Sequence, residues 1–348
     1  MARLLTPVGV ILALLVGAVV AAAALAPQRP APAAAPDPYR WARPAADRLA
    51  AAGLWPELAG ADLTRDATRG DLDRAVAILA GVATASPDAG APAGAWVVNR
   101  RIVGALGLEP ERLGLQAVAT GDGRRMPLPP NFASEILVRE IGLVRNHRRD
   151  DLERSLREPV RLGNLASMVD RARAITDEDR ARLARFRDIR LAAMSPRRFA
   201  VVRAALRQVG QPYVWGGDWP GPRSPWGPQA HGGFDCSGLV WWAFKASVQG
   251  RSLELGRGLF GRTADAMAWE RPRERTRIAE LAPGDLVLLG ERGRRSRRGS
   301  ISHMGIALGD GWMVHSSGSR GGVSVSHLED YWPEGQAFGR RVAELGAA

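Results

Sequence analysis

The chain has 348 residues, 46% of them apolar and 24% charged, which leaves room for two globular domains and excludes a predominantly disordered protein. Its formal net charge of +12 comes almost entirely from arginine, because Lys245 is the only lysine. This charge favours anionic surroundings such as cell-wall polymers, phospholipid headgroups or nucleic acid. No nucleic-acid-binding motif is present, so we expect no nucleic-acid partner. The lone Cys236 excludes an intramolecular disulfide.

The N-terminal segment is predicted to direct the chain out of the cytoplasm. An apolar run over residues 4–26 follows Arg3 and ends in small residues. Residues 1–26 are therefore expected to be a signal peptide or a retained membrane anchor, because about 20 apolar residues can span a bilayer. Residues 27–38 are rich in proline and alanine and are expected to form an extended linker. We expect the remainder to be extracellular or associated with the cell wall.

Residues 39–193 are predicted to form a mostly helical region. Helices with apolar side chains at helical spacing are expected over residues 45–54, 68–79, 97–106, 135–144 and 162–172. A polar helix over residues 176–191 begins with Thr176 and Asp179 in the positions of a capping box. This last helix is expected to bridge the two halves of the chain.

Two of the expected helices begin with related sequences. Residues 69–76, Arg-Gly-Asp-Leu-Asp-Arg-Ala-Val, parallel residues 162–169, Leu-Gly-Asn-Leu-Ala-Ser-Met-Val, and each segment follows a short loop. The pair weakly resembles the helix–loop–helix repeats of S-layer homology modules, which attach proteins to cell walls. The alternative is an unspecialised helical spacer.

A second unit is predicted to begin at Ser195 and to end near residue 342. Ser195 and Pro196 suit the N-cap and first position of a helix that ends at Gly210. The motif Pro212-Tyr213-Val214-Trp215-Gly216-Gly217 comes next, followed by a loop over residues 218–233 that is rich in proline, glycine and tryptophan.

The segment Phe234-Asp235-Cys236-Ser237-Gly238-Leu239-Val240 places the cysteine at the start of a helix. Asp235 is a good N-cap, and apolar side chains give the following helix a buried face. Free N–H groups and the helix dipole are expected to stabilise a thiolate and so lower the pKa of Cys236. An inert buried cysteine is the alternative, but two downstream histidines favour a nucleophile.

These histidines are predicted to lie on one hairpin. Residues 302–308 and 312–316 read as strands around the loop Gly309-Asp310-Gly311. With a three-residue loop, Leu308 pairs with Trp312 and Gly305 with His315, so His303 and His315 become diagonal neighbours on one face. The small Gly305 and Ala307 then leave room for the helix that carries Cys236.

The chemistry assigns a role to each residue. His303 takes the thiol proton of Cys236 and later protonates the leaving amine, while His315 orients His303. Backbone N–H groups near Cys236 and Ser237 are expected to hold an oxyanion. The Tyr213 hydroxyl is a second candidate donor, with a packed aromatic ring as the alternative.

Together these motifs resemble the NlpC/P60 family of papain-like cysteine peptidases, which cleave peptidoglycan stem peptides. The Tyr213 and Cys236 motifs match, as do Pro283-Gly284-Asp285-Leu286, His303-Met304-Gly305-Ile306 and Val314-His315-Ser316. The resemblance covers residues 195–342 and implies an α+β fold, in which a small antiparallel sheet packs on helices. It also implies Cys236, His303 and His315 as the triad, with Tyr213 beside it. The family usually cuts between D-glutamate and a diamino acid, although some members cut elsewhere or are amidases.

Two loops depart from the family pattern, so substrate preference is not carried over. Residues 218–233 form a longer loop than usual, and residues 291–298 are unusually rich in arginine. Residues 256–261 match G-x-G-x-x-G but lack a strand–turn–helix context, so we expect no dinucleotide site. We expect no metal site either, because no fourth ligand accompanies the cysteine and histidines. His147 is expected to be solvated.

The combined interpretation is an exported peptidoglycan hydrolase that cleaves stem-peptide amide bonds through a thioester on Cys236, without a cofactor. Stem peptides are the expected substrate, anionic wall polymers are possible partners, and residues 4–26 are a possible anchor. A non-catalytic wall-binding or scaffold protein with a vestigial or covered papain-like domain is the alternative. A thiol acyltransferase is a third hypothesis.

Overall fold

The computed structural model describes residues 37–225, 227–229, 231–246 and 255–346. The predicted signal peptide or anchor at residues 1–26 and nearly all of the linker at residues 27–38 lie outside the described residues. Within the described ranges, no helix combines the length and apolarity that crossing a membrane requires. The described residues from Tyr39 onward form one compact unit, and the expected boundary near residue 194 stays a prediction.

The first part of this unit is helical, as predicted. Its α-helices are α2 (Arg43–Ala51), α3 (Arg69–Ala80), α4 (Ala95–Ala105), α5 (Glu109–Gln116), α6 (Phe132–Glu140), α7 (Leu162–Arg173) and α8 (Asp177–Ala184). The capping box of Thr176 and Asp179 is confirmed at the start of α8. The predicted long helix ends early, because a 3-10 turn over Arg185–Asp188 follows α8. Helix α5 was not predicted.

Three helices, α3, α4 and α7, begin from segments that are joined into a closed ring. Ala67 N donates to Val160 O (2.7 Å), Val160 N to Ala93 O (3.0 Å), and Ala93 N to Ala67 O (2.8 Å). All three side chains are buried. The two related segments predicted from the sequence open α3 and α7, and the third member of the ring, before α4, has no obvious sequence similarity to them.

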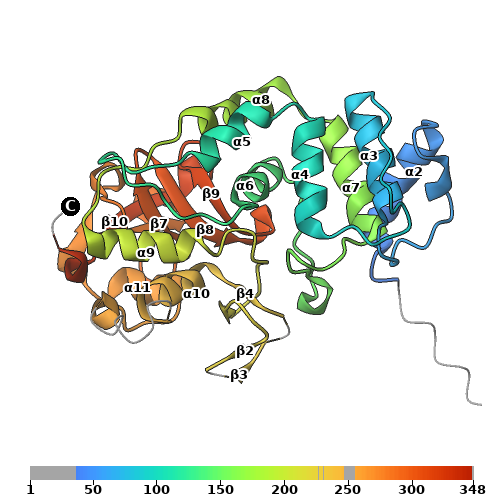
Figure 1. Cartoon of the computed structure of the whole chain (residues 1–348). Coiled ribbons are helices and arrows are strands. Elements are labelled where there is room, and N and C mark those ends of the chain that lie inside the picture. The colour runs from blue at the N-terminus through green and yellow to red at the C-terminus, as the bar shows by residue number, and fades with distance from the viewer. Residues whose placement is uncertain (1–36, 226, 230, 247–254, 347–348) are drawn as a thin grey trace, which may run out of the picture. The chain divides into compact units, whose positions relative to one another are not determined.

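The second part is an antiparallel sheet with helices packed on it, as predicted (Figure 1). The strands of its six-stranded sheet, in the order β5-β10-β6-β7-β8-β9, are β5 (Arg275–Thr276), β6 (Leu286–Gly290), β7 (Ile301–Gly309), β8 (Trp312–Ser317), β9 (Gly322–His327) and β10 (Gln336–Arg340). The helices of this part are α9 (Pro196–Leu206), α10 (Cys236–Trp241) and α11 (Ala264–Trp269), and a π-helical turn over Trp242–Ala246 extends α10.

The described residues of the loop over 218–233 contain two very short antiparallel strand pairs, one enclosed by the other. Strand β1 (Asp218–Trp219) pairs with β4 (Gly233–Phe234), and β2 (Arg223–Ser224) pairs with β3 (Gly227–Pro228). The Trp219 ring meets the Trp242 ring edge-on, with centroids 4.6 Å apart. The inserted loop is thereby held against the end of α10.

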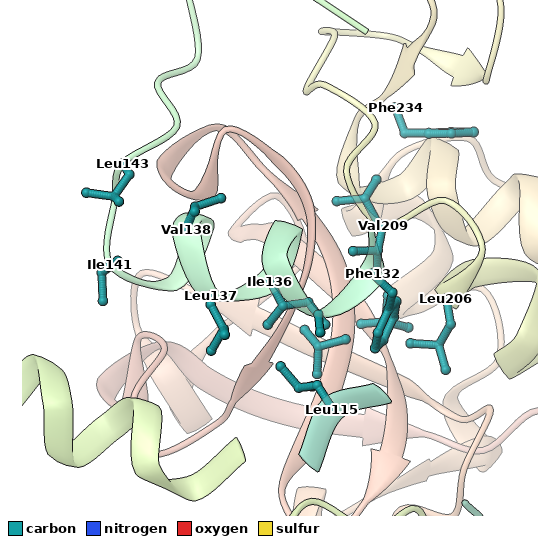
Figure 2. Close-up of a cluster of buried hydrophobic side chains, with 14 of the residues drawn as sticks. Leu115, Phe132, Ile136, Leu137, Val138, Ile141, Leu143, Leu206, Val209 and Phe234 are labelled. Atoms are coloured by element: carbon teal, nitrogen blue, oxygen red, sulfur yellow. The ribbon is translucent and has the colours of Figure 1, made fainter. Parts of the chain in front are cut away.

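The helical part and the sheet share one hydrophobic core. Ile136 and Leu137 of α6 belong to the same cluster as Leu206, Val209 and Phe234 (Figure 2). Helix α6 also lies beside β9, the edge strand of the sheet. This packing carries residues of the helical part close to the sheet that bears His303 and His315.

Candidate active site

Cys236 occupies the first position of α10, as predicted. The Asp235 side chain caps the helix by accepting a hydrogen bond from Gly238 N at 2.5 Å. A Cβ on Gly238 would lie 1.9 Å from Gly217 O, so only glycine allows the Tyr213 motif to approach the helix this closely. Cys236 is 9% exposed.

The predicted lowering of the Cys236 pKa is wrong. Burial raises the pKa of the thiol to about 11, and the nearby Asp235 carboxylate adds to the effect. The backbone N–H groups of Met304, Ser237 and Cys236 act in the opposite direction but do not overcome burial. The thiol, not the thiolate, is therefore the resting form at neutral pH.

The hairpin places His303 and His315 together. Gly305 pairs with His315 as predicted, and His303 Nε2 lies 2.8 Å from His315 Nδ1. The predicted pairing of Leu308 with Trp312 is wrong, because Gly309 takes that position and the register shifts by one residue. Positive φ angles at Asp310 (49°) and Gly311 (78°) make a two-residue turn, which leaves Leu308 in a bulge.

The helix that carries Cys236 covers the opposite face of the sheet from the one predicted. Leu239 of α10 belongs to the core cluster that contains Met304 and Ile306, whereas Ala307 belongs to a separate apolar cluster. Cys236 nevertheless lies beside β7, because the N–H group that acts on its thiol belongs to Met304, the residue after His303.

Both histidines are held in the neutral form. Burial lowers the pKa of His303 to about 4. Burial also lowers the pKa of His315, and the positive charges of His303 and Arg320 add to this. A neutral imidazole beside a neutral thiol can accept its proton, which is the state that general-base catalysis requires.

His315 is hydrogen-bonded to further polar side chains on the side away from His303. His315 Nε2 lies 2.9 Å from Ser326 Oγ, and Ser326 Oγ donates to Glu140 Oε1 at 2.6 Å. The Tyr331 ring packs against both histidines, with centroids 5.4 Å from His303 and 4.3 Å from His315. Sequence reasoning missed these three residues. A serine one strand away could have been inferred from β-strand periodicity, but Glu140 gave no local signal.

Tyr213 lies in the same site. Burial raises its pKa, and the negative charges of Cys236 and Asp235 raise it further, so the hydroxyl stays protonated and can donate. Ser237 is different, because its side chain turns away from the thiol. Its hydroxyl donates to Asp235 Oδ1 at 3.0 Å and accepts from Arg262 Nη1 at 2.9 Å. In Ser237, the backbone N–H and not the hydroxyl therefore remains a candidate oxyanion donor.

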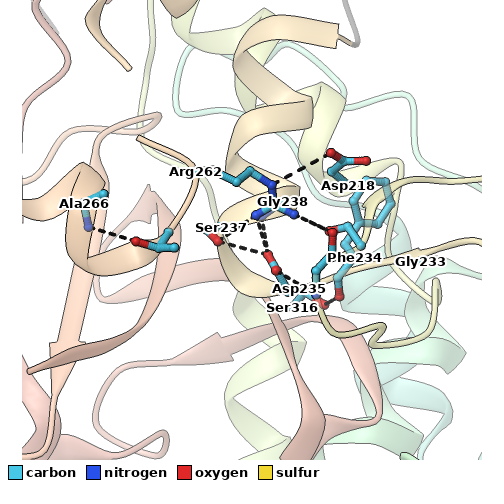
Figure 3. Close-up of polar contacts among 12 residues, drawn as sticks. Asp218, Gly233, Phe234, Asp235, Ser237, Gly238, Arg262, Ala266 and Ser316 are labelled. Atoms are coloured by element: carbon cyan, nitrogen blue, oxygen red, sulfur yellow. Dashed lines mark hydrogen bonds and ion pairs between the residues drawn. The ribbon is translucent and has the colours of Figure 1, made fainter. Parts of the chain in front are cut away.

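Arg262, which sequence reasoning also missed, contacts Asp235 and Ser237 at the start of the cysteine helix (Figure 3) and also bonds to the Tyr213 motif. Its guanidinium donates to Asp235 Oδ1 (3.0 Å) and to the backbone oxygens of Gly216 (2.8 Å) and Gly217 (3.1 Å). Asp235 in turn accepts from Gly216 N at 3.1 Å. One planar cation thus fixes the turn after Tyr213 against the start of α10.

His147 does not lie at the surface, contrary to expectation. It is 6% exposed, with Nδ1 3.3 Å from Glu153 and Nε2 3.3 Å from Asn164. Among the residues that the structure describes, no group of histidine, cysteine, aspartate and glutamate side chains is arranged to hold a metal ion.

A cysteine at a helix start, a histidine pair on an antiparallel sheet and a nearby tyrosine define a papain-like α+β domain. Residues 210–341 match the model of the NlpC/P60 family, and this part of the chain belongs to that family. The match does not reach residues 39–193, so the S-layer homology resemblance stays a prediction.

Several curated relatives share this domain. The chain is 35% identical over 138 residues to the murein DD-endopeptidase MepH of Escherichia coli (strain K12), covering 39% of this chain and 43% of that protein. It is 35% identical over 144 residues to the bifunctional muramidase/DL-endopeptidase CwlT of Bacillus subtilis (strain 168), covering 40% and 35%. The chain therefore spans less than half the length of these relatives.

Among solved structures, the P60 domain of the Mycobacterium avium subspecies paratuberculosis antigen MAP1204 is 30% identical. The alignment covers 42% of this chain and 94% of that one, with a TM-score of 0.31.

Proposed function

We propose that this chain is a cell-wall hydrolase that cleaves amide bonds in peptidoglycan stem peptides, with Cys236 as the nucleophile. Membership of residues 210–341 in the NlpC/P60 family supports this proposal. The names of its relatives support it too, since they include a murein DD-endopeptidase and a DL-endopeptidase. Those two names specify different bonds, so the proposal extends to the substrate class and not to one bond.

The observation that carries the proposal is the contact between the two histidines. His303 Nε2 lies 2.8 Å from His315 Nδ1, and Met304, which follows His303, adjoins the Cys236 thiol. With Nε2 occupied by His315, the Nδ1 atom of His303 is the one left to face the thiol. This is the geometry of a base held in a fixed orientation by a third group.

In the first step, His303 Nδ1 accepts the thiol proton while the Cys236 sulfur attacks the carbonyl carbon. Because burial disfavours both the thiolate and the imidazolium, we expect proton transfer to accompany the attack. We expect the oxyanion that forms to accept hydrogen bonds from the Ser237 backbone N–H and from the Tyr213 hydroxyl.

In the second step, His303 returns the proton to the departing amine nitrogen, the C–N bond breaks, and a thioester remains on Cys236. A water molecule then attacks the thioester with His303 again as base, and the C–S bond breaks. The acid product leaves and the Cys236 thiol is restored. No cofactor takes part in this sequence.

The helical part is proposed to hold the domain at the cell wall. The closed ring through Ala67, Ala93 and Val160 gives three equivalent helix starts, which favours repeated modules over an unspecialised spacer. Export through residues 1–26, S-layer homology and contact with anionic wall polymers belong to the same proposal, and the net charge of +12 favours the last of these.

The test is mass spectrometry of muropeptides after incubation with the full-length chain, with Cys236→Ala as the matched control. We expect new stem-peptide fragments with the unaltered protein and none with the variant, and the fragment masses identify the bond. Transfer of the acyl group to an added amine, without hydrolysis, would favour the acyltransferase. Identical profiles for the two proteins would favour the wall-binding scaffold.

A further inference from the structure

Glu140 is a buried carboxylate that the proposed reaction does not use. It is the last residue of α6, in the helical part, and is 7% exposed. Its side chain points to β9, where Ser326 Oγ donates to Oε1 at 2.6 Å and Ser324 Oγ donates to the same atom at 3.2 Å. A buried carboxylate is costly unless it is hydrogen-bonded and compensated, so its position needs an explanation.

The charge of this carboxylate is compensated locally. Arg320 Nε lies 3.3 Å from Glu140 Oε1, and Arg320 Nη1 donates to the Glu140 backbone oxygen at 2.9 Å. Burial raises the pKa of Glu140 above its usual value, although Arg320 and the two serine hydroxyls act to lower it. The carboxyl group therefore has one cation and two hydroxyl donors around it.

Four side chains form one continuous hydrogen-bonded chain, which we call the relay. It runs from His303 Nε2 to His315 Nδ1 (2.8 Å), from His315 Nε2 to Ser326 Oγ (2.9 Å) and from Ser326 Oγ to Glu140 Oε1 (2.6 Å). The first three residues belong to the sheet, and the last belongs to α6.

Glu140 Oε1 sets the direction of every bond in the relay, because both serine hydroxyls donate to it. Ser326 donates its single proton to Glu140 Oε1, so it must accept from His315 Nε2–H. His315 Nδ1 then carries no proton and accepts from His303 Nε2–H. His303 Nδ1 is consequently left unprotonated, which is the form required of a base that faces the Cys236 thiol.

We propose that Glu140 is a positioning residue, which acts through Ser326 and His315 to keep His303 in the tautomer that can accept the thiol proton. This inference rests on the proposed function, in which His303 is the base. It also means that the helical part supplies a group that the reaction needs. Without the carboxylate, Ser326 is free to donate to His315 Nε2, and the reversed chain protonates His303 at Nδ1.

The kinetic test compares three variants of the full-length chain. Glu140→Gln keeps the shape of the side chain, but its amide can donate a hydrogen bond as well as accept one. Ser326→Ala removes the hydroxyl that links His315 to Glu140. Ser324→Ala is the matched control, because it removes one hydrogen bond to Glu140 from the residue that pairs with His315 on β9, and it leaves every bond of the relay in place. We expect kcat to fall roughly tenfold or more in the first two variants, within the range that general-base catalysis contributes, while KM stays within about twofold and Ser324→Ala retains most activity.

A double variant separates positioning from general loss of stability. Because Glu140 and Ser326 act in series, Glu140→Gln combined with Ser326→Ala is expected to lower kcat no further than either change alone. Losses that multiply in the double variant would contradict a common relay. If Glu140→Gln fails to fold, the kcat values of Ser326→Ala and Ser324→Ala still test the relay. Equal kcat values for these two variants would contradict it.

Histidine ring ¹⁵N spectra test the relay without any activity. In Cys236→Ala protein we expect His303 to carry its proton on Nε2 and His315 on Nε2, and a mixture of tautomers after Ser326→Ala. A proton on His303 Nδ1 in the otherwise unaltered protein would overturn the proposal, as would unchanged kcat in both relay variants. If the unaltered protein cleaves no muropeptide, the proposed function fails. The spectra still test the relay in that case, because they report the tautomers of His303 and His315 without any reaction.

Discussion

At the residue scale, burial changes the Cys236–His303 pair from the charged form expected of a helix N-terminus to a neutral one. The thiol pKa rises to about 11 and the His303 pKa falls to about 4. The helix start still donates its N–H groups, but the desolvation of a nearly enclosed sulfur outweighs them. Activation of the nucleophile then depends on the orientation of His303 more than on the helix dipole.

The lowered His303 pKa predicts a pH dependence of stability. The folded state binds a proton on this ring less readily than the unfolded chain, whose histidine pKa is near 6.5. Stability from the neutral ring is therefore complete above about pH 6.5 and is lost as pH falls towards 4. Over this window we expect unaltered protein to lose on the order of 3 kcal/mol more unfolding free energy than His303→Gln.

Urea denaturation at several pH values between 4 and 7 measures this difference. Using the difference between the two proteins removes the contributions of carboxyl groups that they share. If the free energy of unfolding falls equally with pH in unaltered protein and in His303→Gln, the His303 ring is not held neutral by burial.

At the scale of elements, the site depends on how the turn after Tyr213 is held against α10. Gly238 permits the close approach, and Arg262 joins the two segments through Asp235 and two backbone oxygens. The hairpin that carries the histidines shows the same dependence on detail. The predicted pairing of Gly305 with His315 is correct although the predicted loop is one residue too long, because the bulge at Leu308 compensates for the difference.

Removal of the Arg262 side chain is predicted to loosen the Tyr213 turn. In Arg262→Ala the Asp235 carboxylate and two carbonyl oxygens lose a charged donor, and we expect the free energy of unfolding to fall by about 2 kcal/mol. Arg262→Lys should recover only part of this loss, because an ammonium group cannot reproduce the planar fork. Arg273→Ala, at an exposed arginine, is the control. Equal denaturation midpoints for Arg262→Ala and Arg273→Ala would contradict the role of Arg262.

At the scale of the whole molecule, the helical part does more than precede the sheet. Its helix α6 contributes to the core that contains Leu206, Val209 and Phe234, and its Glu140 reaches the histidine relay. Arg139, the neighbouring residue, donates to Gly210 O at 2.8 Å. The NlpC/P60 domain of this chain is thus completed by a helix that lies outside the family match.

A segment of residues 195–348 expressed alone is predicted to be unstable. Uncovering the side chains packed against α6 costs about 2 kcal/mol for each large apolar residue, and Ser324 and Ser326 lose their carboxylate partner. We expect a less cooperative thermal transition and increased binding of a hydrophobic dye. Co-expression with residues 39–194 should restore both properties. A segment that unfolds as cooperatively as the full-length chain, at the same temperature, would contradict this prediction.

The sequence by itself determined the parts of the site that depend on local signals. An N-cap before Cys236 predicts a helix start, and a strand period of two places His303 and His315 on one face, because both signals act over a few residues. Tertiary structure alone decided the thiol pKa and the contacts of Glu140, Tyr331 and Arg262. These depend on burial and on side chains far away in the sequence, and no local pattern encodes either.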